Sequence, residues 1–218
     1  MIKVISFDIG GTLLTSKSID EYTLKKLTEL LDSPYEKVRS AYKNVFQKKK
    51  GSLNALVNYF CDELDIEIND KILSFFQEKF SSKNNEYVLE ENIETLIEKI
   101  KEKGFKIILL SNSCCLIKNS FSDNLLKNID EIFYSYDYGY TKDEEEFYKI
   151  VQEKLNCKAE EILHVGDTLK SDYILPKKFG WNAIYYGEID DPQVQSINEL
   201  NEIINIMGDF YGDKGKCI

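Results

Sequence analysis

Five short apolar runs constrain the fold of this 218-residue chain most strongly. They occupy residues 3–8, 105–110, 131–134, 162–165 and 182–186, and the run at 131–134 is the weakest of them. Apolar runs of about four to eight residues with little alternation are typical of parallel strands that are buried on both faces. We therefore expect a parallel sheet that is covered by helices on both sides.

The segments between these runs show helical spacing. In residues 91–103 the apolar side chains recur at i, i+3, i+4 and i+7, and Gly104 then ends the pattern. Residues 144–155 carry a similar apolar face, and residues 172–179 lead into another glycine. Strands that alternate with helices through right-handed crossovers form a doubly wound α/β sheet. Such sheets bind ligands beyond the carboxyl ends of their strands, which directs attention to the residues there.

Residues 18–82 differ from the rest because they contain no convincing strand. Their apolar residues recur at helical spacing, and the segment has room for about four helices. We expect these helices to form a small cap that is inserted between the first strand and the remainder of the sheet. The predicted domains are an α/β core at residues 1–15 and 84–218 and a helical cap at residues 16–83, with a return hinge at residues 81–87.

The composition excludes several classes of protein. A net charge of −10 argues against a nucleic-acid partner, although a bound divalent cation can invert the field locally. No apolar stretch is long enough for a signal peptide or a membrane span, so we expect a cytoplasmic protein without a membrane partner. Five cysteines without a CxxC pair are expected to be reduced thiols. The single histidine, His164, lies inside a predicted strand and is expected to be a supporting residue.

Polar groups suited to phosphate and metal binding follow the predicted strands. These groups are Asp8 with Gly11 and Thr12, Ser111 with Asn112, Lys142, and Asp167 with Asp172. Carboxylates that gather at one place repel each other, and a hard cation such as Mg²⁺, which takes oxygen ligands, relieves that repulsion. A lysine beside a hydroxyl and free backbone N–H groups fits a phosphate, and a carboxylate can attack phosphorus. The sequence thus predicts a Mg²⁺ site that handles a small phosphorylated molecule.

Four motifs, in this order, resemble those of the haloacid dehalogenase-like (HAD) superfamily. FDIGGTLL is similar to the first motif, ILLSNS to the second, GYTKDEEEF to the third and HVGDTLKSD to the fourth. The helical insertion is similar to a C1 cap, and VQSINELNEII resembles the terminal helix of phosphoglycolate-phosphatase-like members. The resemblance covers nearly the whole chain. It implies a Rossmann-like core and a hydrolase, with a phosphatase as the expected class.

The resemblance implies a role for each matching residue. Catalytic groups are expected at Asp8, the nucleophile that forms an aspartyl-phosphate, and at Ser111 and Lys142. Phosphate contacts are expected from Gly11, Thr12, Ser111, Asn112 and Lys142. Mg²⁺ is expected to be held by Asp8, the Gly10 carbonyl and Asp167, with Asp172 supporting the metal shell.

Position 10 departs from the family pattern. Phosphatases of this superfamily usually carry a second Asp two residues after the nucleophile, which protonates the leaving oxygen and then activates water. Gly10 has no side chain there, and such a general acid/base contributes roughly 10²–10⁴-fold to the rate. We therefore expect an intact phosphate and Mg²⁺ site with attenuated turnover of ordinary phosphate esters. A second departure is Asp143, which stands where a proline often follows the lysine of the third motif.

Gly10 leaves several alternatives open. The leaving group could need no proton, as with an acyl phosphate, or an acid could come from the cap, where Asp20 and Glu21 lie near its start. The chain could also be a catalytically degenerate HAD-fold binding protein. Phosphonatase-like chemistry would use a cap lysine as a Schiff base, with Lys48, Lys49 and Lys50 as candidates. Dehalogenase chemistry likewise does not use the second Asp.

The string DIGGT also resembles the phosphate loop of actin-like sugar kinases. In those proteins a second strand should follow the glycine turn directly, whereas residues 16–31 are predicted to be helical here. The later motifs have no role in a kinase of that type. The HAD resemblance is therefore the favoured interpretation of the first motif.

Overall fold

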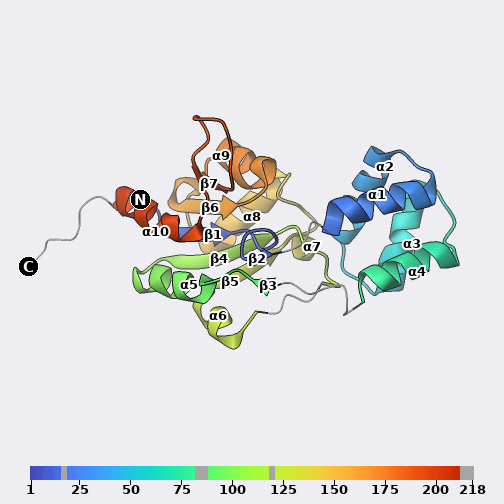
Figure 1. Cartoon of the computed structure of the whole chain (residues 1–218), viewed down its shortest axis with the longest axis horizontal. Helices are drawn as coiled ribbons and strands as arrows, with labels where there is room; N and C mark the ends of the chain where they lie inside the picture. Colours follow the sequence, from blue (N-terminus) through green and yellow to red (C-terminus); the bar gives the residue numbers. More distant parts are fainter. Residues whose placement is uncertain (16–18, 82–87, 118–120, 212–218) are drawn as a thin grey trace, which may run out of the picture.

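A computed structural model describes residues 1–15, 19–81, 88–117 and 121–211, and Figure 1 shows an α/β core beside a group of helices. The core contains a six-stranded sheet in which every pair of neighbouring strands is parallel. In spatial order its strands are β5 (Glu131–Tyr134), β4 (Lys106–Ser111), β1 (Val4–Phe7), β6 (Ile162–Gly166), β7 (Asn182–Tyr186) and β8 (Ser196–Ile197). The five predicted strands are confirmed, and so is the parallel α/β class.

Two apolar clusters cover the two faces of this sheet. On one face the buried residues of β1 and β4 pack against α5 (Ile93–Glu102) and the C-terminal helix α10 (Ile203–Tyr211). On the other face Val4, Ile108 and Phe133 pack against α8 (Glu145–Leu155). The sheet is therefore wound on both sides, as its apolar strands predict. The remaining core helices are α6 (Asp123–Asn128), α7 (Ser135–Tyr138) and α9 (Leu175–Lys178).

The register of the central strands fixes the position of the carboxyl edge. Phe7 of β1 is aligned with Leu109 of β4 and with Val165 of β6. The chain therefore leaves the sheet at neighbouring points after these three strands. Since β1 lies in the interior of the sheet, Asp8 begins its loop with a strand on either side.

Four helices within the described residues 19–81 are grouped at one end of the molecule (Figure 1), and we refer to this group as the cap. They are α1 (Ile19–Leu31), α2 (Tyr35–Phe46), α3 (Leu53–Leu64) and α4 (Asp70–Lys79). Their shared core includes Phe46, Phe60 and Phe76, whose rings lie within 4.8–5.9 Å of one another, centroid to centroid. Two helix starts are capped, α3 by the Ser52 hydroxyl and α4 by the Asn69 side chain. Both predicted domain boundaries, at 15/16 and 83/84, involve residues outside the described ones.

Three details differ from the sequence-based expectation. A two-residue strand β2 (Leu14–Thr15) follows the first loop and pairs with β3 (Val88–Leu89), and β8 extends the sheet. A strand of two residues is too short to produce a recognisable periodic pattern in the sequence. The helix expected at residues 172–179 is a π-helical turn (Leu169–Ile174) followed by α9. Pro176 lacks the N–H that a regular helix would donate to the preceding turn, which favours this irregular start.

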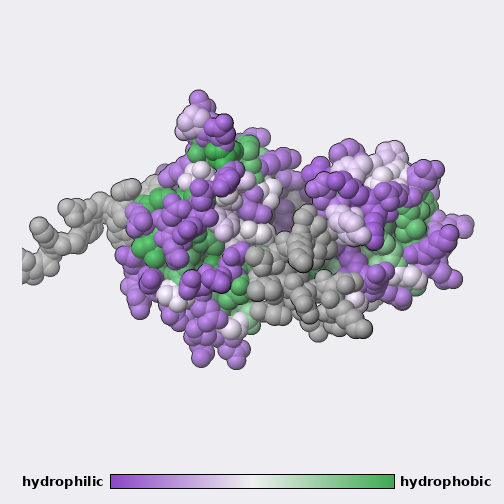
Figure 2. Space-filling view, in the orientation of Figure 1, coloured by the Kyte–Doolittle hydropathy of each residue, from purple (hydrophilic) through white to green (hydrophobic). Residues whose placement is uncertain are grey.

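The visible surface is mainly hydrophilic on both the core and the cap, and apolar residues appear in limited areas (Figure 2). Among the described residues, no helix is both long and apolar enough to cross a membrane.

We predict that Phe46→Ala destabilises the protein by about 3–5 kcal/mol, because a ring that is 0% exposed and stacked on others leaves a cavity that the cap cannot close. Tyr59→Ala is the matched control, since this cap aromatic is 47% exposed and its loss is expected to cost less than about 0.5 kcal/mol. Urea unfolding of both variants measures the difference. Equal losses would contradict the packing of the cap described above.

Candidate active site

Three acidic side chains meet at the carboxyl edge of the sheet. Asp8 follows β1, Asp167 follows β6 and Asp172 lies in the π-helical turn, and each contributes an oxygen atom within 4.8 Å of the others. Asp8 is 6% exposed and Asp172 is 0% exposed. Burial raises the pKa of Asp8 despite the opposing charge of Lys142, and burial together with the charge of Asp172 raises the pKa of Asp167. Such a cluster needs positive charge beside it.

Lys142 brings that charge into the cluster. Its ammonium group donates to Oδ1 of Asp8 and, at 2.6 Å, to Oδ1 of Asp172. The residue is only 3% exposed. Burial alone would lower the pKa of Lys142, but the charges of Asp172 and Asp8 outweigh it and raise the pKa, so the side chain stays protonated. The cluster therefore contains three carboxyl groups and one ammonium group, so further positive charge would stabilise it.

Asp172 is anchored more firmly than the other two acids. Its Oδ2 accepts from the backbone N–H of Thr168 at 3.0 Å, and its Oδ1 lies 3.1 Å from Nε2 of His164. Burial would raise the pKa of Asp172, but the charge of Lys142 and the hydrogen bond from His164 outweigh it and lower the pKa. Asp172 therefore remains a carboxylate that holds Lys142 in place.

His164 supports this anchor from inside β6. Burial lowers its pKa, which keeps the imidazole neutral. A carboxylate only accepts hydrogen bonds, so Nε2 carries the proton that is donated to Asp172. Nδ1 is then the acceptor for the hydroxyl of Ser6, 2.8 Å away in β1. The position of His164 agrees with the supporting role expected from the sequence.

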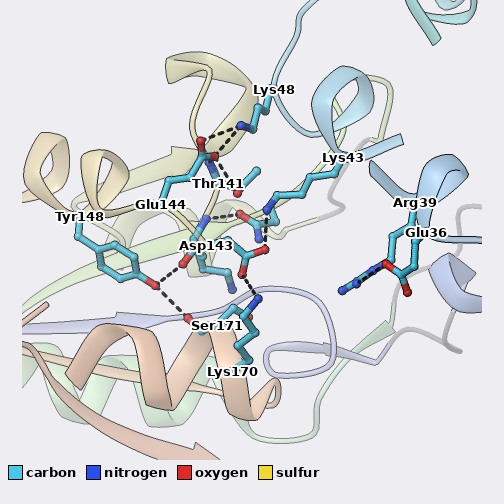
Figure 3. A network of polar contacts seen from close by, with 12 residues as sticks. Glu36, Arg39, Lys43, Lys48, Thr141, Asp143, Glu144, Tyr148, Lys170 and Ser171 are labelled. Atoms are coloured by element: carbon cyan, nitrogen blue, oxygen red, sulfur yellow. Dashed lines mark hydrogen bonds and ion pairs between the residues drawn. The ribbon is translucent and has the colours of Figure 1, made fainter. Parts of the chain in front are cut away.

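The loop that carries Lys142 is fixed by two neighbours. The side-chain oxygen of Asn112 accepts from the backbone N–H of Lys142 at 2.8 Å. The hydroxyl of Tyr148 lies 2.8 Å from the carbonyl oxygen of Lys142. It also lies 3.0 Å from the carbonyl oxygen of Ser171, a contact that Figure 3 marks with a dashed line. Tyr148 was missed by the sequence analysis, because an aromatic residue in an amphipathic helix gives no signal for its hydroxyl. It links the third and fourth motifs across the core.

Two adjacent glycines after Asp8 have opposite surroundings. Gly11 has a φ of +84°, and a Cβ on it would lie 2.1 Å from Oδ2 of Asp167. Gly11 therefore lets the loop approach Asp167 closely, which a larger residue would prevent. Gly10 is exposed, and a Cβ on it would meet no heavy atom within 4 Å. The space for a side chain at position 10 is present.

The acid cluster fits the expected Mg²⁺. Oδ1 of Asp167 is buried and has no hydrogen-bond partner among the described residues. A carboxylate oxygen in that state costs free energy unless a cation or water meets it, and Mg²⁺ takes oxygen ligands of this kind. Both oxygens of Asp172, by contrast, already accept hydrogen bonds. Asp8 and Asp167 are therefore the side chains best suited to bind the ion, and Asp172 is better suited to hold Lys142.

A cavity of about 390 Å³ lies between the acid cluster and the cap. Five of the predicted site residues contribute to its wall: Asp8, Gly10, Ser111, Asn112 and Lys142. The cap side of the wall includes Leu24, Tyr42 and Gln47. Gly11 and Thr12 are not part of this wall, and Thr12 is fully buried. Ser111, Asn112 and Lys142 are thus better placed to meet a ligand than the side chain of Thr12.

The alternative cap residues lie elsewhere. Glu21 is exposed and pairs with Lys25 at 2.8 Å, and the side chain of Asp20 is outside the described ones. Lys48 pairs with Glu144 at 2.7 Å, and the ammonium of Lys49 lies 5.4 Å from the ring centroid of Tyr59.

The third of those cap lysines, Lys50, pairs with Asp137 in α7. None of the three lysines contributes to the wall of the cavity, and neither does Glu21. Their positions give no support to a Schiff-base lysine or to Glu21 as a replacement acid.

Comparison with known proteins identifies the family and similar folds. A family model described as haloacid dehalogenase-like hydrolase matches residues 2–180. No curated protein sequence matches the chain. Among solved structures, a 2-haloacid dehalogenase from Pseudomonas syringae pv. Tomato DC3000 is similar, with 17% identity, a TM-score of 0.63, and coverage of 96% of this chain and 100% of that one.

Two further similar structures are a phosphatase and an enzyme in complex with magnesium and phosphate. A HAD phosphatase from Thermococcus onnurineus is 20% identical, with a TM-score of 0.58 and coverage of 95% of this chain and 98% of that one. A HAD family enzyme from Bacteroides thetaiotaomicron, in complex with magnesium and inorganic phosphate, is 16% identical, with a TM-score of 0.55 and coverage of 88% and 98%. At these identities the likeness shows the fold alone.

A doubly wound sheet that is interrupted after its first strand by a helical insertion defines a class of capped α/β proteins. The family model spans residues 2–180, which is most of the chain, and includes the first strand and all four motifs. The protein therefore belongs to the haloacid dehalogenase-like hydrolases.

We predict that Gly11→Ala lowers the free energy of unfolding by more than about 1 kcal/mol, because alanine is strained at a positive φ and its Cβ would collide with Asp167. Gly10→Ala is the matched control in the same loop, where the Cβ meets open space, and we expect a change within about 0.5 kcal/mol. Thermal unfolding in the absence of Mg²⁺ measures both. A Gly10→Ala loss as large as that of Gly11→Ala would contradict this loop geometry.

Proposed function

We propose that this protein is a Mg²⁺-dependent hydrolase that transfers the phosphoryl group of a small phosphorylated molecule to Asp8 and then to water. The observation that carries the proposal is the buried contact between Asp8 and Lys142, with the unpartnered oxygen of Asp167 beside it. A phosphoryl group needs an attacking oxygen, a fixed cation and a metal ligand set, and these three residues offer them together. The magnesium and phosphate in the Bacteroides thetaiotaomicron structure support the same assignment.

The protein residues have separate tasks in the proposed reaction. An oxygen of Asp8 attacks phosphorus, and the bond from phosphorus to the leaving oxygen breaks with its electron pair going to the leaving group. The Ser111 hydroxyl and the Lys142 ammonium bind the phosphoryl oxygens, and Lys142 also shields Asp8 from the negative charge of the substrate. Water then attacks phosphorus, the bond between phosphorus and the Asp8 oxygen breaks with its electron pair returning to the carboxylate, and the protons of the water leave with the inorganic phosphate. When bound, Mg²⁺ supplies further positive charge to the transferring group.

Asp172, His164 and Ser6 position Lys142 without touching the substrate in this proposal. Ser6 contacts His164 at 2.8 Å, and His164 contacts Asp172 at 3.1 Å. Asp172 in turn accepts from the Lys142 ammonium at 2.6 Å. The Lys142 ammonium is shared between Asp172 and Asp8, so Asp8 is not its only anionic partner. We infer that this chain of contacts keeps Asp8 available for attack.

Gly10 limits the proposed activity to substrates that tolerate slow proton transfer. No side chain at position 10 can protonate a leaving oxygen, so an acyl phosphate, whose leaving carboxylate needs no proton, is the better class of substrate. A catalytically degenerate binding protein is the competing proposal, and Gly10 is the observation that favours it. The two differ in whether any phosphorylated compound is turned over.

The direct test compares hydrolysis of p-nitrophenyl phosphate and acetyl phosphate by wild type, Asp8→Asn and Gly10→Asp with Mg²⁺. We expect wild type to favour acetyl phosphate, Asp8→Asn to be inactive on both, and Gly10→Asp to raise ester hydrolysis by about tenfold or more. The open space at position 10 allows the new carboxylate to fit. A wild type that is inert on both substrates and binds neither Mg²⁺ nor a phosphate mimic would contradict the enzyme proposal.

A second test concerns the metal. Asp167→Asn is expected to weaken Mg²⁺ binding by about tenfold or more, because a neutral amide replaces a charged oxygen ligand. Calorimetric titration with Mg²⁺ measures this without any substrate. Asp191→Asn is a matched control, since this exposed acid lies outside the cluster, and its affinity should equal that of wild type. An unchanged affinity in Asp167→Asn would remove Asp167 from the metal site.

A further inference from the structure

The cavity between core and cap is electrostatically polarised. Its floor adjoins the cluster of Asp8, Asp167 and Asp172, which Lys142 neutralises only in part. The other side of its wall carries three cations: Arg39 and Lys43 from α2, and Lys170 from the π-helical turn. This concentration of positive charge is notable in a chain whose net charge is −10. A cavity with such walls attracts anions and orients them.

Arg39 is the single arginine among the 28 basic residues of the chain. It stands on the face of α2 that also presents Tyr42, Lys43 and Gln47 to the cavity, at i, i+3, i+4 and i+8. The residues of the same helix that are buried in the cap core are Val38, Ala41, Tyr42, Val45 and Phe46. Arginine differs from lysine in its rigid planar fork, which matches a carboxylate or phosphate with two parallel hydrogen bonds.

Packing does not account for Arg39. Its side chain is 57% exposed, and its contact with Glu36 is a 3.5 Å ion pair between two exposed groups on one helix. Pairs of this kind contribute little to stability. Figure 3 shows Arg39 across the cavity from Asp143 and Lys170, with its guanidinium pointing toward the core. The side chain is therefore available to a ligand.

Asp143 contacts two of these cations, Lys43 and Lys170, and its single negative charge can neutralise one of them. Lys43 donates to its Oδ2 at 2.5 Å, and Lys170 lies 3.8 Å from its Oδ1 (Figure 3). Burial would raise the pKa of Asp143, but the hydrogen bond from Lys43 and the charges of Lys43, Lys170 and Arg39 outweigh it and lower the pKa. Asp143 is thus ionised and pairs with Lys43. Arg39 and Lys170, whose side chain is 67% exposed, keep their charge for a further anion.

We propose that Arg39 and Lys170 form a second anion subsite, so that the substrate carries a carboxylate or second phosphate in addition to its transferring phosphoryl group. This inference rests on the proposed function, because the phosphoryl group must lie at Asp8 for the second anion to reach the cap side. The subsite spans cap and core: Arg39 comes from α2 and Lys170 from the turn after β6. An anion held by both would therefore link the two parts of the molecule across the substrate.

The test measures binding of two matched pairs of ligands by calorimetry, with the turnover-deficient Asp8→Asn variant and Mg²⁺. The short pair is 3-phosphoglycerate and glycerol 3-phosphate, and the long pair is 6-phosphogluconate and glucitol 6-phosphate. Within each pair the first ligand has a carboxylate that the second lacks. We expect the carboxylate to tighten binding by about tenfold or more in at least one pair, as a charge-assisted contact does. Propane-1,3-diol bisphosphate tests whether a second phosphate is preferred to the carboxylate, and tighter binding of either supports the subsite.

Adding Arg39→Gln, and separately Lys170→Gln, to this background assigns the effect to the subsite. Each change should reduce the preference for the carboxylate at least about fivefold and leave the ligand without it nearly unchanged. Lys149→Gln is the matched control, because this exposed lysine pairs with Glu145 on α8 outside the cavity. Melting temperatures of all variants verify that each one folds.

Two results would overturn the inference. One is equal affinity within both pairs, and the other is an Arg39→Gln change that weakens all ligands alike, which would make Arg39 a general attractor of phosphate. In either case Mg²⁺-dependent binding of glycerol 3-phosphate, or turnover of acetyl phosphate by wild type, would leave the proposed function standing. Absence of all binding and all turnover would overturn both.

Discussion

The active-site region depends on one buried interaction, the ammonium of Lys142 held between Asp8 and Asp172. Neither carboxylate is stable at this depth without the cation, and the cation is not stable there without them. The surrounding structure holds these groups in place. Strands β1 and β6 bring the acids to one edge of the sheet. Asn112 and Tyr148 make hydrogen bonds to the backbone of Lys142, and His164 makes one to Asp172. The negative charge that Lys142 does not neutralise would favour binding of a metal ion.

Much of this arrangement could be predicted because parallel strands bring distant residues to one edge. Asp8, Ser111 and Asp167 are far apart in sequence, yet each closes or follows a buried apolar run, and the register of β1 with β4 and β6 makes them neighbours. Tyr148 could not be predicted in the same way, since its role depends on where its hydroxyl points. The contact by which Asp172 holds Lys142 could not be predicted either, because it depends on which oxygens accept hydrogen bonds.

The two departures from the family pattern have different consequences. Gly10 has open space around it, so in the proposed function its lack of a side chain affects proton transfer without disturbing the loop. Asp143 adds a carboxylate that forms an ion pair with Lys43 of the cap. Glu144 of the core forms a second ion pair, with Lys48 of the cap. The helix that carries Lys43 also brings Arg39 to the cavity. In the proposed function the phosphoryl transfer is carried out by core residues, and the proposed second anion subsite, shared by Arg39 and Lys170, selects the substrate.

The central claim is that Asp8 accepts a phosphoryl group, and labelling with acetyl phosphate tests it most directly. Wild-type protein with Mg²⁺ should take up one phosphoryl group, sensitive to hydroxylamine as acyl phosphates are and located on Asp8 by mass spectrometry. The label should be lost slowly, because no side chain at position 10 activates the water that removes it. Asp8→Asn should take up none. Absence of label in the wild type, or an equal label in Asp8→Asn, would contradict the account.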